Sequence, residues 1–249
     1  RKSYPAYKGL KGAYQFPDYQ LFIEHVQGDP FAAPSALRIF VPHSKAKFPE
    51  RYYWDKCSKV ALQDALLRRF AEISAKFCYQ AKGSGKSGVI QVSHCGQEVL
   101  ERTACEITKE GIHIRFFVGF PANGRTINSG ELEKILFVYL PKCVEMSLYH
   151  RKVPERETEQ VICLKEDQRV IREELKKRGL IAFVANGSIL PRQSGNSDLP
   201  MKDAVPFQSP KSMEITIQLR HRGSITGMGI RKGITLIAGG GYHGKSTLL

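Results

Sequence analysis

Hydrophobic positions recur at helical spacing most clearly between residues 55 and 80. The apolar members of this stripe are Val60, Leu62, Leu66, Leu67, Phe70, Ile73 and Phe77. Cations occupy the other faces, at Lys59, Arg68, Arg69 and Lys76. This separation predicts an amphipathic helix, which the glycines between residues 83 and 88 bring to an end.

Weaker helical patterns cover residues 131–140 and 163–178, and Gly179 follows the second as a C-cap. Runs typical of strands lie at residues 21–25, 36–41, 89–93, 112–119, 180–185, 213–219 and 234–238. We expect residues 1–20 to form a wrapping arm or loop, and residues 186–210 to form a long loop or interdomain connector. The alternation of strands and helices predicts an α/β architecture.

Composition is that of a globular protein, with 249 residues, of which 42% are hydrophobic and 25% charged. The longest apolar run lies near residues 135–140 and is too short to span a membrane. The chain opens on Arg1-Lys2-Ser3, which we interpret as a processed or trimmed start, before which a mitochondrial presequence would leave no trace. Six cysteines lack C-x-x-C spacing, so we expect thiols in a reducing compartment, with neither a disulfide framework nor a metal cage.

The charge balance is informative, since 38 Lys and Arg against 24 Asp and Glu give a net charge of +14 and a pI near 9.6. Such an excess favours anionic partners, namely nucleic acid, acidic lipid or a polyphosphate ligand. Mitochondrial matrix proteins are often basic as well, so charge alone does not select among them.

The last residues match the phosphate-binding pattern G-x-x-x-x-G-K-[ST] in full. The predicted nucleotide-binding residues are Gly239, Gly240, Gly241, Tyr242, His243, Gly244, Lys245, Ser246 and Thr247. Glycines let successive backbone N–H groups turn toward phosphate oxygens, and Lys245 is expected to neutralise the β and γ phosphates. Ser246 is expected to bind Mg²⁺ and Thr247 to reach the α phosphate, beside a helix N-terminus. The ligands predicted are therefore ATP and Mg²⁺.

A second glycine-rich string, at residues 83–87, looks similar but does not match the pattern. Gln80 stands where the first glycine is required, and a predicted helix precedes the string where a strand is needed. We interpret it as a flexible basic loop.

Residues 213–249, ending ITGMGIRKGITLIAGGGYHGKSTLL, resemble the start of an ABC-type ATPase domain. Further blocks extend the likeness upstream: EHVQGDPFAAPS, GQEVLERTA, VGFPANGRTI, GSILPRQSGNSDLPM and VPFQSP. Together they resemble the predicted ABC-class ATPase family, whose members carry their own N-terminal domain. The likeness implies an N-terminal α/β domain at residues 1–185, followed at 186–249 by a connector and by the first strands and phosphate loop of an ABC-type ATPase domain.

That family includes an RNA-binding ABC-fold ATPase of the kinetoplastid mitochondrial RNA-editing accessory complex. The resemblance therefore implies ATP hydrolysis, RNA binding, a mitochondrial location, other RNA-processing proteins as partners and a homodimer formed through the ATPase domain. The remaining ABC motifs and the catalytic residues are expected after Leu249, so we expect the chain by itself to hydrolyse nothing. An aromatic residue that stacks on adenine is usual some thirty residues before the loop. None stands there, and Phe207, somewhat further upstream, is a candidate.

RNA contacts are expected from cations in mobile or glycine-rich settings. The candidates are Lys82, Lys86, Arg102, Arg115 and Arg125, with single-stranded backbone contacts expected. Taken singly, each of them is better explained as a solvated surface cation or as a member of a structural salt bridge. His25 and Asp29 could serve a polar site, although a turn aspartate and a half-buried histidine explain them as well.

The leading hypothesis is thus an RNA-binding ABC-class ATPase that is not a transporter. One alternative is a nucleotide-regulated assembly factor whose basic surface binds acidic protein partners. A kinase or phosphotransferase built on the same loop is the other.

Overall fold

The computed structural model describes residues 2–249, which form two compact units divided between Ile162 and Cys163. We call them the N-terminal unit and the C-terminal unit, and each is described by itself. The structure confirms a mixed α/β fold in which an N-terminal α/β unit precedes strands that lead into the phosphate loop.

An antiparallel six-stranded sheet forms the centre of the N-terminal unit. Its strands are β1 (Gly12–Gln15), β2 (Gln20–His25), β3 (Ser35–Pro42), β4 (Ile90–Gln91), β5 (Cys105–Ile107) and β6 (Gly111–Val118). The order is β1-β2-β3-β6-β4, and β5 also pairs with β6. Buried and partly exposed side chains alternate along β3 and most of β6, so one face of the sheet is core.

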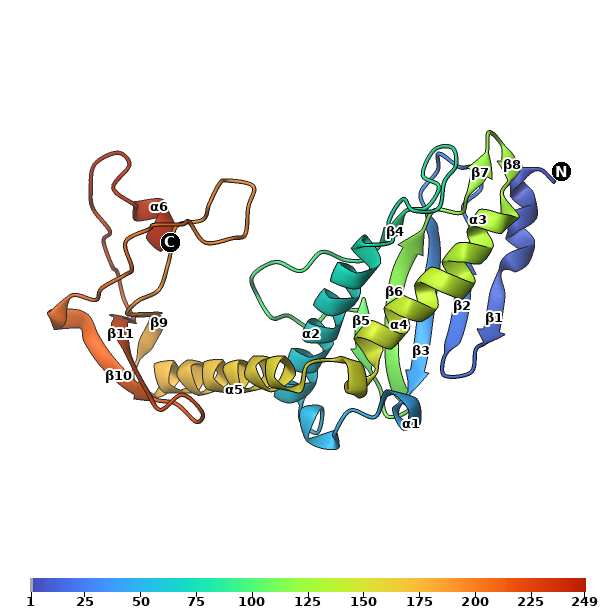
Figure 1. Cartoon of the computed structure of the whole chain (residues 1–249). Coiled ribbons are helices and arrows are strands. Elements are labelled where there is room, and N and C mark those ends of the chain that lie inside the picture. Colours follow the sequence, from blue (N-terminus) through green and yellow to red (C-terminus); the bar gives the residue numbers. More distant parts are fainter. Residues whose placement is uncertain (1) are drawn as a thin grey trace. The chain divides into compact units, whose positions relative to one another are not determined.

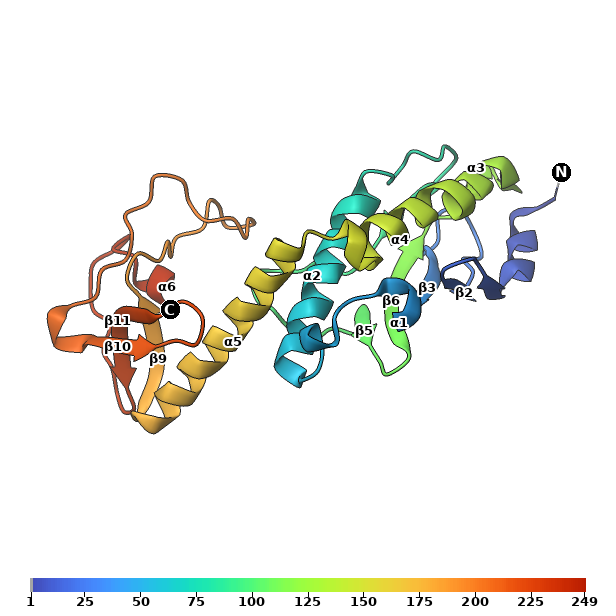
Figure 2. The same ribbon diagram turned by 60° about the horizontal axis from the view of Figure 1, so that its bottom comes forward.

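Helix α2 (Lys56–Ala75) and the helical segment α3 (Ser129–Lys134) to α4 (Leu140–Leu148) lie side by side over that core face (Figures 1 and 2). Asp55 caps α2 by accepting from the N–H of Ser58 at 2.7 Å. Phe70 of α2 packs against Phe116 of β6 with ring centroids 5.2 Å apart. A π-helical turn, η3 (Ile135–Tyr139), joins α3 to α4. The periodicity thus located the helices, although α2 ends earlier and the second helix runs further than predicted.

Short elements complete the N-terminal unit. They are the 3-10 helices η1 (Tyr4–Leu10), η2 (Glu50–Tyr52) and η4 (His150–Lys152), helix α1 (His43–Ala46), and the hairpin strands β7 (Ala122–Asn123) and β8 (Thr126–Ile127). Of the wrapping arm or loop expected at residues 1–20, the loop is wrong, because this segment contains η1 and β1. Burial of Tyr4 and Tyr7, whose hydroxyls donate to the carbonyls of Phe120 and Pro121, anchors η1 on the unit.

In the C-terminal unit a three-stranded antiparallel sheet has the order β10-β11-β9. Its strands are β9 (Leu180–Ala185), β10 (Glu214–Gln218) and β11 (Ser224–Arg231), with η5 (Lys211–Met213) before β10 and α6 (Lys245–Leu248) at the end. Helix α5 (Glu155–Lys177) begins in the N-terminal unit and ends in this one. Strand β9 was expected at the end of an N-terminal domain of residues 1–185, but it pairs with β11 in the sheet that precedes the phosphate loop, within the C-terminal unit.

One strand prediction in this unit was wrong, and one strand was missed. Residues 234–238 form no strand, because no described strand offers them a ladder partner, and Ile234 and Leu236 are fully exposed or nearly so. Strand β11 was missed because Gly227 and Gly229 weaken its β-propensity. Gly227 is required there, since a Cβ would lie 2.2 Å from the carbonyl oxygen of Val184.

Candidate functional site

The phosphate loop follows β11 after an extended connection, and its backbone turns at Tyr242 and Gly244, both at positive φ. The Lys245 ammonium lies across the loop and donates to the carbonyls of Gly239 at 2.7 Å and Gly240 at 2.5 Å. The imidazole Nδ1 of His243 accepts from the N–H of Gly240 at 3.1 Å. The loop therefore folds around its own lysine, which holds a positive charge at the centre of the turn.

The donors needed by a polyphosphate are available in this loop. Among the hydrogen bonds of residues 2–249, none uses the N–H groups of Gly241, Tyr242, His243 or Gly244. The amine of Lys245 and the hydroxyls of Ser246 and Thr247 stand directly after them. This donor set fits a triphosphate with its magnesium ion, because it combines free N–H groups, one cation and hydroxyl oxygens.

A small apolar cleft of about 220 Å³ adjoins the loop within the C-terminal unit. Its walls are Leu190, Pro191, Val205, Phe207, Gly244, Thr247 and Leu248. The sequence proposed Phe207 as the aromatic for adenine, and the structure brings it beside the end of the phosphate loop. An apolar cleft next to a phosphate cradle is suited to the flat face of a base.

Phe207 is held in position by the base of the long loop that precedes it. Its N–H donates to the carbonyl of Ser188, and its carbonyl accepts from Gly187. The side chain of Asn186 links the two ends of this long loop. It accepts from the N–H of Ser209 at 2.7 Å and donates to Glu214 at 3.3 Å. The hydrogen bond from the Ser209 hydroxyl is the main cause that lowers the pKa of Glu214, and the hydrogen bond from Asn186 is the next. The ionised carboxylate therefore accepts hydrogen bonds from both ends of the loop.

The loop at residues 82–88 in the N-terminal unit, where we expected a flexible basic loop at residues 83–87, is closely packed at its glycines. A Cβ at Gly85 would lie 2.5 Å from the carbonyl oxygen of Pro30, and one at Gly88 would lie 2.1 Å from that of Ala81. The N–H of Lys86 donates to the Pro30 carbonyl, and the Ser87 hydroxyl accepts from Ala122. The glycines therefore lock this loop against two neighbouring segments.

Lys82 and Lys86 belong to this closely packed loop. The ammonium of Lys82 donates to the carbonyl of Tyr79 at 3.1 Å, and its N–H donates to Glu131 at 2.9 Å. The hydrogen bond from Lys134, followed by that from the Lys82 N–H, lowers the pKa of Glu131. Lys86 is exposed beside Tyr79, where both border a hollow of about 290 Å³.

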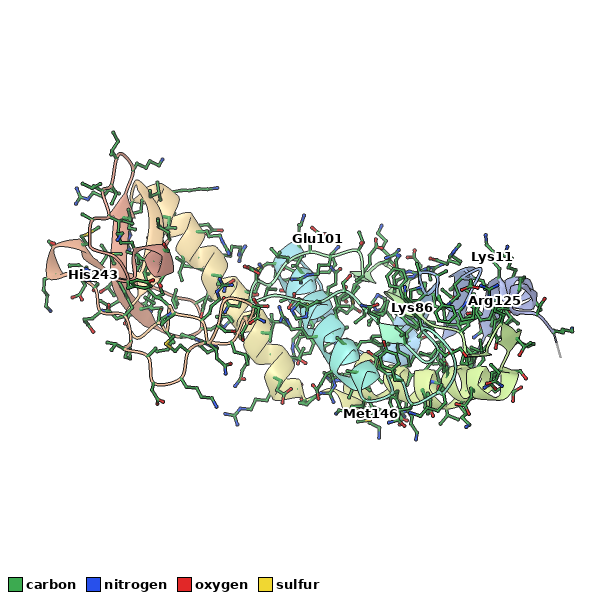
Figure 3. All side chains as sticks on the ribbon, turned by 90° about the horizontal axis from the view of Figure 1, so that it is seen from above. Lys11, Lys86, Glu101, Arg125, Met146 and His243 are labelled. Carbon is green, nitrogen blue, oxygen red and sulfur yellow. The ribbon has the colours of Figure 1, made fainter. Side chains whose placement is uncertain are left out.

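Arg125 joins the same end of the unit through the turn between β7 and β8. Its side chain is 84% exposed and lies 3.7 Å from Asp29, and the N–H of Gly124 donates to the Ser84 hydroxyl. Figure 3 labels Lys86, Arg125 and Lys11 on the N-terminal unit. Asp29 itself caps its turn by accepting from the N–H of Phe31 at 2.9 Å.

Two exposed aromatic rings accompany these cations and were missed by the sequence reasoning. Phe31 is 62% exposed and Tyr79 is 59% exposed. Phe31 lies against Gly85, and Tyr79 has positive φ. Alternation and periodicity do not describe turns, so only the Gly-Asp-Pro-Phe turn itself could have indicated an exposed ring. We call Phe31, Tyr79, Lys82, Lys86 and Arg125 the loop cluster.

The other two predicted cations lie elsewhere. Arg102 pairs with the buried carboxylate of Asp64 and donates to the carbonyls of Glu98 and Leu100. Arg115 projects from the outer face of the sheet, where it donates to the Thr103 carbonyl at 2.6 Å and to Glu106 at 3.0 Å. His25 lies at the exposed end of β2.

Comparison with known proteins agrees with this arrangement of an N-terminal unit and a phosphate-loop unit. Residues 1–151 match the N-terminal domain of ATPases of the ABC class, and residues 154–249 match the P-loop domain of the same ATPases. The chain therefore belongs to the ABC-class ATPase family, as the sequence blocks indicated.

A curated relative, an uncharacterized protein of Methanocaldococcus jannaschii, is 33% identical over 95 residues, which cover 33% of this chain and 20% of that protein. The chain thus spans about a fifth of that relative's length. Among the described residues, no helix combines the length and the apolar character needed to cross a membrane.

Proposed function

We propose that this protein binds Mg²⁺–ATP at residues 239–247 and single-stranded RNA on its N-terminal unit, as an ABC-class ATPase that acts on RNA. The observation that carries the RNA proposal is the loop cluster, in which Lys82, Lys86 and Arg125 lie on loops that contact one another and that carry two exposed rings. Cations that bind phosphates beside rings that stack on bases are the usual means of holding a single strand. The net charge of +14 supports the same proposal.

Within this proposal the resemblance extends to a role as an accessory factor in mitochondrial RNA editing or processing, as in kinetoplastids. Other RNA-processing proteins are the partners it suggests, and a homodimer through the ATPase domain is the assembly it suggests. In the C-terminal unit, Lys245 would hold the terminal phosphates, Ser246 the magnesium ion, and Phe207 the adenine ring. The bound metal would supply charge neutralisation at the phosphates.

The RNA proposal is tested with a labelled single-stranded RNA of about 12 nucleotides over a series of salt concentrations. Wild-type affinity should fall steeply as salt increases. The double variant Lys82→Ala, Lys86→Ala should have a shallower dependence, with the magnitude of the slope of log K against log salt reduced by about 1.4. The matched control, Lys109→Ala with Lys142→Ala, removes two exposed lysines outside the cluster and should leave the slope nearly unchanged. Failure of the wild type to bind at low salt would reject RNA and favour acidic protein partners.

The nucleotide proposal is tested by titrating a fluorescent ATP analogue with magnesium. Lys245→Ala should abolish measurable binding, because the remaining N–H groups lack a compensating cation. Phe207→Ala should weaken binding about fivefold or more, and Phe207→Tyr should retain it, because stacking needs a ring. Lys202→Ala, an exposed lysine of the same unit, is the control. Equal affinity for Lys245→Ala and the wild type would contradict the proposal.

A further inference from the structure

The face of the N-terminal sheet that points away from α2 and α4 carries aromatic and cationic side chains in register. The aromatic and cationic side chains that turn to this face are Phe22, Arg38, Phe40, His113, Arg115 and Phe117, and we call them the outer face. Glu24 and Glu106 turn to the same face, where they pair with two of its arginines. The residues between them, including Leu37, Ile39 and Ile114, are buried under the helices. The outer face therefore results from strand alternation, and most of it is only partly buried.

Strand register arranges these side chains in rows across the sheet. Phe40 pairs with His113, and their rings lie 4.7 Å apart at an interplanar angle of 30°. Phe22 pairs with Arg38, which pairs in turn with Arg115. The Arg38 guanidinium lies 3.9 Å from the centroid of the Phe22 ring. One row therefore holds a ring and two guanidinium groups, and the next holds two rings, with neighbouring strands about 4.8 Å apart.

The ring most open to solvent is Phe117, at 47% exposure, whose cross-strand partners are Ala36 and Gln91. Gln91 also borders the hollow that contains Lys86 and Tyr79. The outer face is therefore continuous with the loop cluster through Gln91. An RNA strand whose phosphate binds Lys86 would have the Phe117 ring close to its neighbouring bases.

The charges of the outer face are balanced, because Arg38 pairs with Glu24 at 2.7 Å and Arg115 pairs with Glu106 at 3.0 Å. Both ion pairs are partly exposed, so the face offers planar guanidinium groups and rings without a net charge, which suits the uncharged bases rather than the phosphates. Burial is the main cause that lowers the pKa of His113, and the charges of Arg38 and Arg115 lower it further. The imidazole is therefore neutral and suited to stacking.

We propose that the outer face is a stacking platform for the unpaired bases of the RNA, with Phe117 and Phe40 as its principal rings. The inference rests on the proposed RNA function and adds where the bases lie. Bases stack on phenyl rings, imidazoles and guanidinium planes alike, and all three are present in register. The loop cluster then holds the backbone, and the outer face holds the bases.

The test uses the full chain and a single-stranded RNA of about 12 nucleotides with 2-aminopurine at a central position, whose emission falls when it stacks. Phe117→Ala and Phe40→Ala should each weaken binding about fivefold or more and restore emission. Their slope of log K against log salt should equal that of the wild type, because no phosphate contact is lost. Phe117→Leu keeps an apolar side chain without a ring and should behave like Phe117→Ala.

Phe137→Ala is the matched control, because Phe137 is an exposed phenylalanine on η3, outside the outer face. It should bind and quench like the wild type. Normal binding and quenching by Phe117→Ala and Phe40→Ala, while Lys82→Ala with Lys86→Ala weakens binding, would overturn the platform and leave the proposed function intact. Absence of wild-type binding at low salt would reject both. A changed sedimentation mass of Phe117→Ala with unchanged RNA binding would assign the face to protein contacts and overturn the platform.

Discussion

At the scale of single residues, the Asp64 carboxylate is almost wholly removed from solvent, with 1% of its side chain exposed. Arg68 binds one of its oxygens at 2.5 Å, and Arg102 binds the other. A buried carboxylate that loses a cation keeps the cost of its desolvation. The geometry therefore gives Arg102 a structural role that its sequence neighbourhood does not reveal.

Arg102→Ala should accordingly lower the free energy of unfolding of the N-terminal unit by about 2–3 kcal/mol. Urea unfolding followed by fluorescence of Trp54, the single tryptophan of the chain, reports on this unit. Arg125→Ala is the control, since its exposed side chain predicts a change within about 0.5 kcal/mol. Equal losses in the two variants would contradict the role assigned to Arg102.

Buried acids of the same unit predict a pH dependence. Burial raises the pKa of the Cys143 thiol to about 12 and that of Tyr7 to about 12. In the unfolded chain these groups titrate near ~8.5 and ~10. The unfolded state therefore loses its protons first as pH rises, so stability is full below about pH 8.5 and declines toward about pH 12.

Urea unfolding at about pH 7.5 and about pH 10 should show this decline, and Cys143→Ala should reduce its slope because one raised pKa is removed. A free energy of unfolding that stays constant over the interval would contradict the assignment.

At the scale of elements, Gly119 follows β6, and a Cβ there would lie 1.7 Å from the carbonyl oxygen of Lys86. No side-chain rotation relieves an overlap with backbone. Gly119→Ala should therefore lower the free energy of unfolding by more than ~2 kcal/mol and displace the Lys82–Lys86 loop.

Gly130→Ala is the control for this substitution, because a Cβ added at this position in α3 would have nothing within 4 Å. This variant should gain about 0.5–1 kcal/mol, as alanine is the better helix former. Similar stability of Gly119→Ala and wild type in urea would show that the two segments are not held in close contact.

The elements also show what sequence reasoning could reach. The stripe from Val60 to Phe77 located α2, and alternation located β2, β3 and β6, because one-sided burial leaves a period in the sequence. Close packing between backbone segments leaves no period in the sequence. The close packing at Gly85 and the strand β11, which contains Gly227, were therefore not predicted. The phosphate loop was identified by the spacing of its glycines, lysine and serine. The position of Phe207 beside it depends on backbone hydrogen bonds with Gly187 and Ser188, which no sequence pattern indicates.

At the scale of the whole molecule, two units of different character share one chain, and each holds one proposed ligand site. The phosphate loop and Phe207 lie in the C-terminal unit, and the loop cluster and outer face lie in the N-terminal unit. A ligand stabilises the fold that contains its site by RT ln(1 + [L]/Kd), which is about 1.4 kcal/mol at tenfold Kd. The location of Trp54 in the N-terminal unit lets this stabilisation be measured separately for each ligand.

RNA should therefore raise the urea midpoint reported by Trp54 fluorescence, by an amount that declines with salt because phosphate contacts drive binding. Mg²⁺–ATP should raise the transition seen by circular dichroism, which includes the C-terminal unit, and Lys245→Ala should remove that shift alone. The double variant Lys82→Ala, Lys86→Ala should reduce the RNA shift and keep the ATP shift. An RNA shift seen only by circular dichroism, with the Trp54 midpoint unchanged, would move the RNA site out of the N-terminal unit, because a ligand protects the fold to which it binds.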